Sequence, residues 1–271
     1  MRISMQILSD RLRQNYPECR MGEMSEEMNL KRPLFYQSGN DFRKNKVYVA
    51  REDDLTGSGL AGHGDNLVLV VGMKLWSEER PFTGVCFFPQ GVHPEELFNT
   101  VQRIFDTYDA WDERMQNLAL SERTLKNLLD GSHRIFHNPI MVSTTDGFVI
   151  DYSSLMDTMP EFQEILQHNQ VTVCAEEGRD CTSEVCHYQD PVTQKNNLFL
   201  DIYDKNRNAY RVILVEATRK LKIYDEYLLF HLAKYIQQML EKYTVLQADI
   251  SYTLDRLLSN ILAALSEFLT V

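Results

Sequence analysis

Apolar residues at helical spacing in the last part of the chain restrict its fold more than any other feature. They lie three or four residues apart, with one four-residue stutter after Ile250: Leu229, Leu232, Ile236, Met239, Tyr243, Leu246, Ile250, Leu254, Leu257, Ile261, Leu265 and Phe268. This pattern predicts a long coiled-coil-like helix over residues 225–271. One small domain cannot bury the whole stripe. We therefore expect the first half to pack on its own domain and the second half to pair with a second copy.

The stripe thus predicts a homodimer held through residues 229–268. The final stretch, residues 260–271, is mainly apolar and contains no glycine, proline or charged tail that would end a helix. We expect the helix to lead into a further domain in the natural protein.

Charge argues against nucleic acid as a direct partner of this chain. The formal net charge is −11, and the densest basic stretch is Arg219, Lys220 and Lys222. Three basic residues are too few to neutralise a nucleic-acid backbone. If the protein regulates transcription, its DNA-binding part is a C-terminal domain that is not present here.

Several absences indicate a cytoplasmic protein without a membrane partner. No segment is long and apolar enough to predict a membrane span, and the N-terminus lacks the apolar run of a signal peptide. The five cysteines are odd in number and scattered, which is typical of free thiols in a reducing compartment.

The first domain, residues 1–120, is predicted to be α+β. A short helix should occupy residues 3–16, and strands should follow at 33–36, 47–50, 67–72 and 85–88. The run LVLVV is apolar at every position, which predicts a central strand covered on both faces. From Pro94 to about residue 119 the apolar positions recur at helical spacing, so we expect one long helix.

The second domain, residues 121–224, also reads as α+β. It should begin with a helix at 122–129 capped by Ser121, followed by a hairpin around Asp146-Gly147 and a helix at 160–168. An irregular cysteine-rich segment over 171–190 then leads to a second hairpin, 198–204 and 209–217. This order predicts an antiparallel sheet with flanking helices.

Segments in both predicted domains resemble the N-terminal half of PucR/CdaR-type transcription regulators, which control small-molecule catabolic genes in bacteria. The segments that carry the resemblance are RPLFY (32–36), KVYVA (46–50), VVG (70–72), ELFNTVQRIFDTYDAWDERM (96–115) and LKNLLDGSHRIFHNPIMVSTTDGFVIDYSS (125–154). The resemblance implies that the second domain is GAF- or PAS-like and senses a metabolite. The helix-turn-helix of such regulators is missing from this chain.

A ligand pocket in a domain of that kind would lie between the sheet and the segment that covers it. The candidate lining residues on the expected elements are Tyr152, His187, Tyr188, Phe199, Tyr203 and Arg211. Strand alternation sends about half of such residues to the other face. An inward Arg211 would favour an anionic or carboxylated ligand through a bidentate contact. We therefore expect an aromatic, purine-like or carboxylated metabolite.

Metal binding and catalysis are the less favoured interpretations. Cys174, Cys181, Cys186 and His187 combine thiols with an imidazole, but the spacing lacks the paired CxxC of structural zinc sites. Ordinary packing explains these residues more simply. No nucleophile, base and oxyanion site can be assembled, so we expect no catalytic residue, no cofactor and no enzyme.

The sequence therefore predicts the ligand-sensing and dimerisation region of a bacterial transcription regulator. The alternative is a constitutive oligomerisation or scaffold module that binds a protein partner and no metabolite. A closed, fully packed second domain would favour that alternative.

Overall fold

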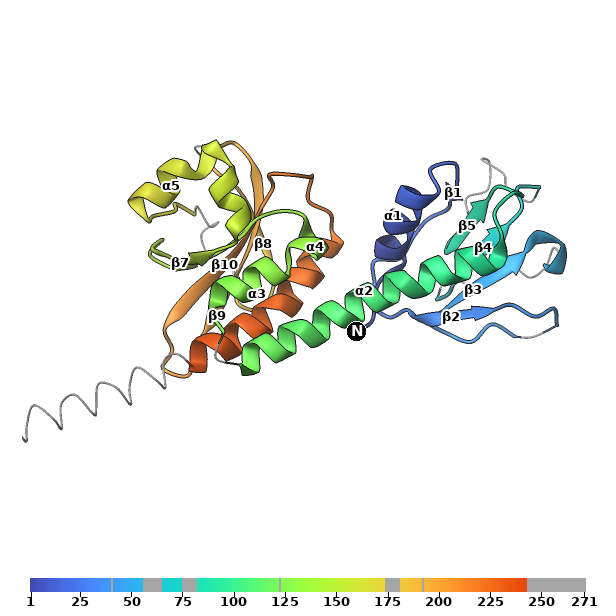
Figure 1. The fold of residues 1–271 in the computed structure, drawn as a ribbon, viewed down its shortest axis with the longest axis horizontal. Coiled ribbons are helices and arrows are strands. Elements are labelled where there is room, and N and C mark those ends of the chain that lie inside the picture. Colours follow the sequence, from blue (N-terminus) through green and yellow to red (C-terminus); the bar gives the residue numbers. More distant parts are fainter. Residues whose placement is uncertain are drawn as a thin grey trace, which may run out of the picture. The chain divides into compact units, whose positions relative to one another are not determined.

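The computed structural model describes residues 1–39, 41–55, 65–74, 82–121, 123–173, 181–191 and 193–242. The chain divides into two compact units. Unit 1 is Met1–Glu113 with Lys222–Tyr227, and unit 2 is Arg114–Leu221 with Leu228–Val271. The class is mixed α+β, as predicted, with a sheet in each unit (Figure 1). The division falls inside α2 (Pro94–Leu120), and the domain boundaries expected from the sequence remain predictions.

The sheet of unit 1 is mainly parallel. Its strands lie in the order β1-β5-β4-β3-β2, where β2 to β5 run parallel and β1 is antiparallel to β5. Every residue of β4 is buried, which confirms the prediction of a central strand covered on both faces. The bounds are β1 Arg20–Met21, β2 Lys31–Phe35, β3 Lys46–Arg51, β4 Leu67–Val71 and β5 Val85–Phe88, with a single 3-10 turn, η1, at Glu52–Asp54 in the described residues between β3 and β4.

Two helices pack on one face of this sheet. Phe98 of α2 stacks on Phe35 with ring centroids 4.4 Å apart, and Tyr16, directly after α1 (Met5–Asn15), meets Phe88 edge-on at 5.4 Å. The opposite face carries a separate apolar cluster that includes Tyr48, Val68, Val70, Val85 and Phe87. The two clusters explain why the middle strands are apolar at successive positions.

Unit 2 contains an antiparallel sheet in the order β7-β6-β10-β9-β8. The predicted Asp-Gly hairpin joins its first two strands, where Gly147 has a φ of 92°. The segment over 171–190 is not irregular throughout, because Cys186–Gln189 forms an edge strand. The bounds are β6 Ile140–Thr144, β7 Val149–Tyr152, β8 Cys186–Gln189, β9 Asn196–Tyr203 and β10 Ala209–Val215.

Helices cover one face of this sheet (Figure 1). They are α3 (Leu125–Gly131), α4 (His133–Phe136), the last turns of α2 and a helix over residues 224–242. The predicted start of α3 at Ser121 is wrong. Thr124 is the N-cap, because its side chain and that of Asn127 form a capping box.

The first residues of the predicted stripe are buried in this helical layer: Leu229, Leu232, Ile236 and Met239. The described part of the predicted helix therefore packs within the chain. Residues 243–271, including the predicted dimer contacts from Tyr243 to Phe268, lie outside the described residues.

A short covering segment lies on the other face of the sheet, with α5 on the opposite side from α3 (Figure 1). It consists of η2 (Ser154–Thr158), η3 (Pro160–Phe162) and α5 (Gln163–His168), where the sequence predicted a helix at 160–168. Met156, Phe162 and Val171 from this part of the chain are buried against the sheet. We call this sheet surface the covered face.

Asn138, just before β6, ties the covered sheet to the chain after β10. Its side-chain oxygen accepts hydrogen bonds from the backbone N–H groups of Ala217, Thr218 and Arg219 at 2.9–3.2 Å, and its amide donates to the Arg219 carbonyl. Asn138 is 1% exposed, so no solvent replaces these bonds. One side chain thereby fixes the turn that leads into the helix over 224–242.

Candidate functional site

A row of polar side chains crosses the covered face in the middle of an apolar surface. Arg211 on β10 lies directly opposite Ser143 on β6 and opposite Asp201 on β9. Residues directly opposite each other in antiparallel strands place their side chains on the same face, with Cβ atoms roughly 5 Å apart. Ser143, Arg211 and Asp201 therefore form one continuous group, which we call the polar row.

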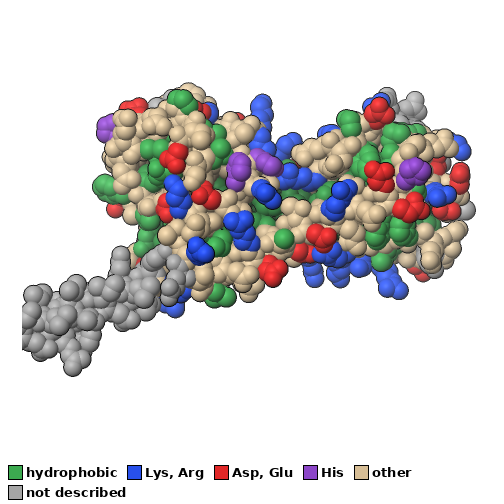
Figure 2. Space-filling model, viewed as in Figure 1, with side chains coloured by type: hydrophobic (Ala, Val, Ile, Leu, Met, Phe, Trp, Pro, Cys, Tyr) green, Lys and Arg blue, Asp and Glu red, His purple; other side chains and the backbone are tan. Residues whose placement is uncertain are grey.

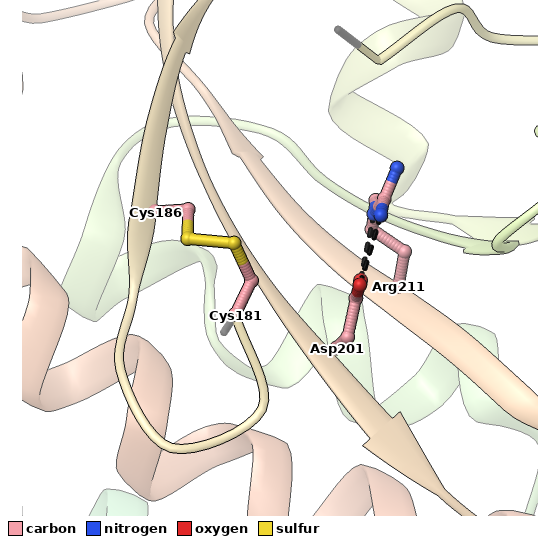
Figure 3. The surroundings of a disulfide bond; sticks show 4 residues. All are labelled: Cys181, Cys186, Asp201 and Arg211. Carbon is pink, nitrogen blue, oxygen red and sulfur yellow. Dashed lines mark hydrogen bonds and ion pairs between the residues drawn. A yellow bond between two sulfur atoms is a disulfide. The ribbon is translucent and has the colours of Figure 1, made fainter. Parts of the chain in front are cut away.

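Arg211 and Asp201 form a bidentate ion pair. Arg211 Nε donates to Asp201 Oδ1 at 2.7 Å, and Nη2 donates to Oδ2 at 2.8 Å (Figure 3). The two side chains are only 10% and 15% exposed. The guanidinium also lies 4.5 Å from the centre of the Phe199 ring. The pair is thus held in one geometry by charge, by hydrogen bonds and by an aromatic face.

Ser143 differs from its two neighbours in the row. It is 0% exposed, and within the described part of the chain its hydroxyl has no hydrogen-bond partner. A buried hydroxyl without a partner is unfavourable, and each such group in a native protein calls for an explanation.

The polar row is bordered by a large apolar cluster. The next row of the sheet carries Met141, Ile213, Phe199 and Cys186, and the covering segment adds Met156 and Phe162. Ionic and hydroxyl groups embedded in such a layer bind polar atoms more strongly than they would in water. The covered face thus combines a large apolar area with a few polar groups in fixed positions.

Sheet register places most of the six predicted ligand residues on the covered face. Tyr152, Tyr188, Phe199, Tyr203 and Arg211 belong to it, through pairing with residues such as Met141, Asn197 and Ala209. Phe199 and Tyr188 are buried, whereas Tyr203 is 45% exposed at the end of β9. Tyr152 lies at the end of the edge strand β7. Burial and a hydrogen bond with Asp157 raise the pKa of its phenol.

His187 does not join this group. It is exposed, and it pairs with Leu198, whose side chain lies on the helix-covered face. The alternation of β8 directs Cys186 and Tyr188 to the covered face and His187 to the opposite one, so His187 does not lie with the other five candidates.

The cysteine-rich segment contains a disulfide. Cys181 and Cys186 are bonded to each other beside β9 (Figure 3), so the expectation of free thiols is wrong for these two residues. Disulfide sulfurs are not thiolate ligands, which removes two of the four residues considered for a metal. Cys174 lies outside the described residues, and within those residues no group of three or more His, Cys, Asp and Glu is placed to hold a metal ion.

Sequence reasoning missed Ser143 and Asp201. Each is a polar residue that directly follows an apolar one in its strand, at a position that alternation directs to the same face as Met141 or Phe199. That signal was present in the sequence, but the register between strands was needed to bring the two residues to Arg211.

Comparisons with known proteins supply no family for the chain: no protein-family model matches it, and no curated protein matches it. Among the residues that the structure describes, no helix is long and apolar enough to cross a membrane. The geometry of the covered face therefore carries the functional argument.

Proposed function

We propose that this chain is the ligand-sensing and dimerisation region of a bacterial transcription regulator of the PucR/CdaR type, which controls small-molecule catabolic genes. The metabolite binds on the covered face of unit 2. The observation that carries the proposal is the polar row of Ser143, Arg211 and Asp201, buried within an apolar layer. Such a layer offers a ligand both apolar contact area and fixed orienting groups.

The topology of unit 2 supports a PAS-like sensor domain. Its five strands form a single antiparallel sheet in the order β7-β6-β10-β9-β8, which agrees with the antiparallel sheet expected of the GAF- or PAS-like domain that the sequence resembles. Helices pack on one face, and short helical turns cover the other. A sensor of this type binds its ligand between the sheet and the covering turns.

The C-terminal helix provides the route for a signal. Its residues 228–242 belong to unit 2, where Gln237 donates to the Tyr203 carbonyl at the end of β9. A change in the position of β9 on ligand binding would thus reach the helix. We propose that the later residues pair with a second copy and pass the change to a DNA-binding domain.

The charge distribution fits a chain that does not itself contact DNA. Figure 2 shows acidic and basic side chains interspersed within each unit on the face it displays. The net charge of −11 would repel a nucleic-acid backbone.

Native mass spectrometry tests the proposal. The chain is incubated with a mixed panel of neutral and anionic aromatic metabolites, and its mass is measured under non-denaturing conditions. The proposal predicts a dimer that retains one compound per subunit. A chain that retains no compound would contradict ligand sensing, and a monomer at high micromolar concentration would contradict dimerisation.

Two features of unit 2 favour the alternative, a scaffold module that binds a protein partner. The covered face carries a cluster of buried apolar side chains, among them Met156, Phe162 and Phe199, as a packed domain does. Phe148 and Ile150 at the β7 edge are 57% and 42% exposed, and exposed apolar residues often mark protein contacts. Substituting both by serine should abolish partner binding in that case and leave metabolite binding unchanged in ours.

A cytoplasmic location is part of the same proposal. The Cys181–Cys186 disulfide argues against it, because disulfides persist mainly in oxidising compartments. Trapping thiols by alkylation in intact cells, followed by peptide mass analysis, would show which form the protein adopts. Cytoplasmic protein should carry the alkylated thiols.

A further inference from the structure

We infer that the polar row recognises a neutral, planar compound with a carbonyl group, such as an aromatic amide, and rejects the corresponding carboxylate. The inference rests on the proposed function and names the ligand class for the same site. An unpaired Arg211 would favour an anionic ligand, whereas the ion-paired Arg211 seen here favours a neutral one.

The charge balance of the row argues against an anion. Both oxygens of Asp201 are engaged with Arg211, so the pair is neutral as a unit. A carboxylate bound beside this neutral pair would bring an additional negative charge into a mostly buried apolar layer, close to the Asp201 carboxylate, which is only 15% exposed. No cation there is left to compensate that charge, because Arg211 is already neutralised by Asp201.

Two polar groups remain available beside the ion pair. The pair uses Arg211 Nε and Nη2, and Figure 3 shows the remaining guanidinium nitrogen directed away from Asp201. Ser143 Oγ, on the other side of Arg211, has no partner among the described residues. A guanidinium N–H and a hydroxyl can both donate to one carbonyl oxygen, and the hydroxyl can instead accept from an amide N–H.

The surroundings select for a planar aromatic body. Phe199 lies beneath the guanidinium, and Tyr188 meets Phe199 with ring centroids 5.6 Å apart. Phe162 of the covering segment is buried in the same cluster. Aromatic rings pack favourably against such groups, and the apolar layer disfavours any further charge.

Matched pairs of probes test the ligand class directly: benzamide with benzoate, 2-naphthamide with 2-naphthoate, and nicotinamide with nicotinate. Affinities are measured by titration calorimetry on the full chain. We expect each amide that binds to do so at least about tenfold more tightly than its acid, since only the acid brings an uncompensated charge into the buried layer. Tighter binding of the acids, or no binding of any amide, would overturn the inference.

Two variants locate the effect. Ser143→Ala should weaken amide binding by about five- to tenfold, the usual effect of one lost hydrogen bond. Asp201→Asn leaves Arg211 with an uncompensated charge, so its preference should change from the amide to the acid. Asp151→Asn is the matched control, because Asp151 pairs with Val142 on the other face of the sheet and its variant should behave as wild type.

Asp201→Asn is the variant most at risk of unfolding. The double variant Asp201→Leu/Arg211→Met removes both charges together and should fold, but it should lose amide binding by more than about tenfold. Unchanged amide affinity in Ser143→Ala and in the double variant would overturn the inference. If the mixed panel then yields a ligand of another class, only the inference about the ligand class is contradicted. If the panel yields no ligand, the proposed sensing function is contradicted as well.

Discussion

The backbone N–H of Asp201 donates a 2.7 Å hydrogen bond to the carbonyl of Cys181, so the residue that pairs with Arg211 is also bonded to the disulfide segment. Cys186, the other end of the disulfide, lies directly opposite Phe199 on β9. The disulfide thus joins the edge strand and its preceding loop to the strand that carries the ion pair. Its loss should affect both stability and the polar row.

Substituting Cys181 and Cys186 together by serine should lower the free energy of unfolding by about 2 kcal/mol, the value expected for a short cross-linked loop. The midpoint of urea denaturation measures the change. Dithiothreitol should produce a similar loss in the wild-type chain and none in the variant. Equal midpoints for wild type and variant without reductant would show that the disulfide does not stabilise unit 2.

Removing one partner of the ion pair should destabilise the folded protein, whereas replacing both partners by apolar residues should change its stability little. Arg211→Met leaves the Asp201 carboxylate buried without its partner and should cost about 3 kcal/mol in the free energy of unfolding. Asp201→Leu/Arg211→Met removes both charges and should cost clearly less than Arg211→Met or Asp201→Leu alone. Denaturant titration of the three variants provides the comparison; additive losses would argue that the two residues act independently.

Asn138→Ala removes a side chain that holds the chain after β10 through several hydrogen bonds. Because the substitution leaves three backbone N–H groups and one carbonyl without their partner, we expect a loss of about 2–4 kcal/mol. Asn138→Asp should retain the acceptor contacts and lose only the bond to the Arg219 carbonyl, so it should be milder. A scan of thermal melting would rank the two variants, and the opposite ranking would contradict the bonding pattern.

Cys19 and Cys86 should resist alkylation in the folded protein. Burial raises the pKa of both thiols, and Cys86 is 0% exposed. Because the pKa of the thiol is higher in the folded state, only the unfolded chain ionises once the pH passes the ordinary thiol value of 9.0. The free energy of unfolding is therefore unaffected by these thiols below that pH and falls above it. Iodoacetamide at pH 8 followed by peptide mapping should leave both unmodified until denaturant is added. Modification of Cys86 without denaturant would contradict the packing of unit 1.

The elements with strong local patterns could be predicted from the sequence. β4 is apolar at each position, α2 begins at a proline and repeats every three to four residues, and the Asp146-Gly147 turn specifies its hairpin. β8 could not be predicted, since Cys186–Gln189 has no β-branched residue and its strand exists through pairing with β9.

The candidate site was predictable only in part. Alternation within β9 and β10 directs Phe199 and Arg211 to one face, but the partner of Arg211 depends on the register that the turn between these strands sets. In that turn Asp204 accepts hydrogen bonds from the backbone N–H groups of Asn206 and Asn208. The Cys181–Cys186 bond was also beyond sequence reasoning, since an odd number of cysteines does not specify a pairing.

The most direct test of ligand sensing on the covered face is a melting-temperature screen of wild type beside Asp201→Leu/Arg211→Met, with the same panel of aromatic amides, acids and heterocycles. A compound that binds the folded chain raises its melting temperature by mass action. We predict that at least one neutral carbonyl compound stabilises the wild type and leaves the double variant unchanged. A panel that stabilises neither protein, or both to the same extent, would contradict a binding site at the polar row.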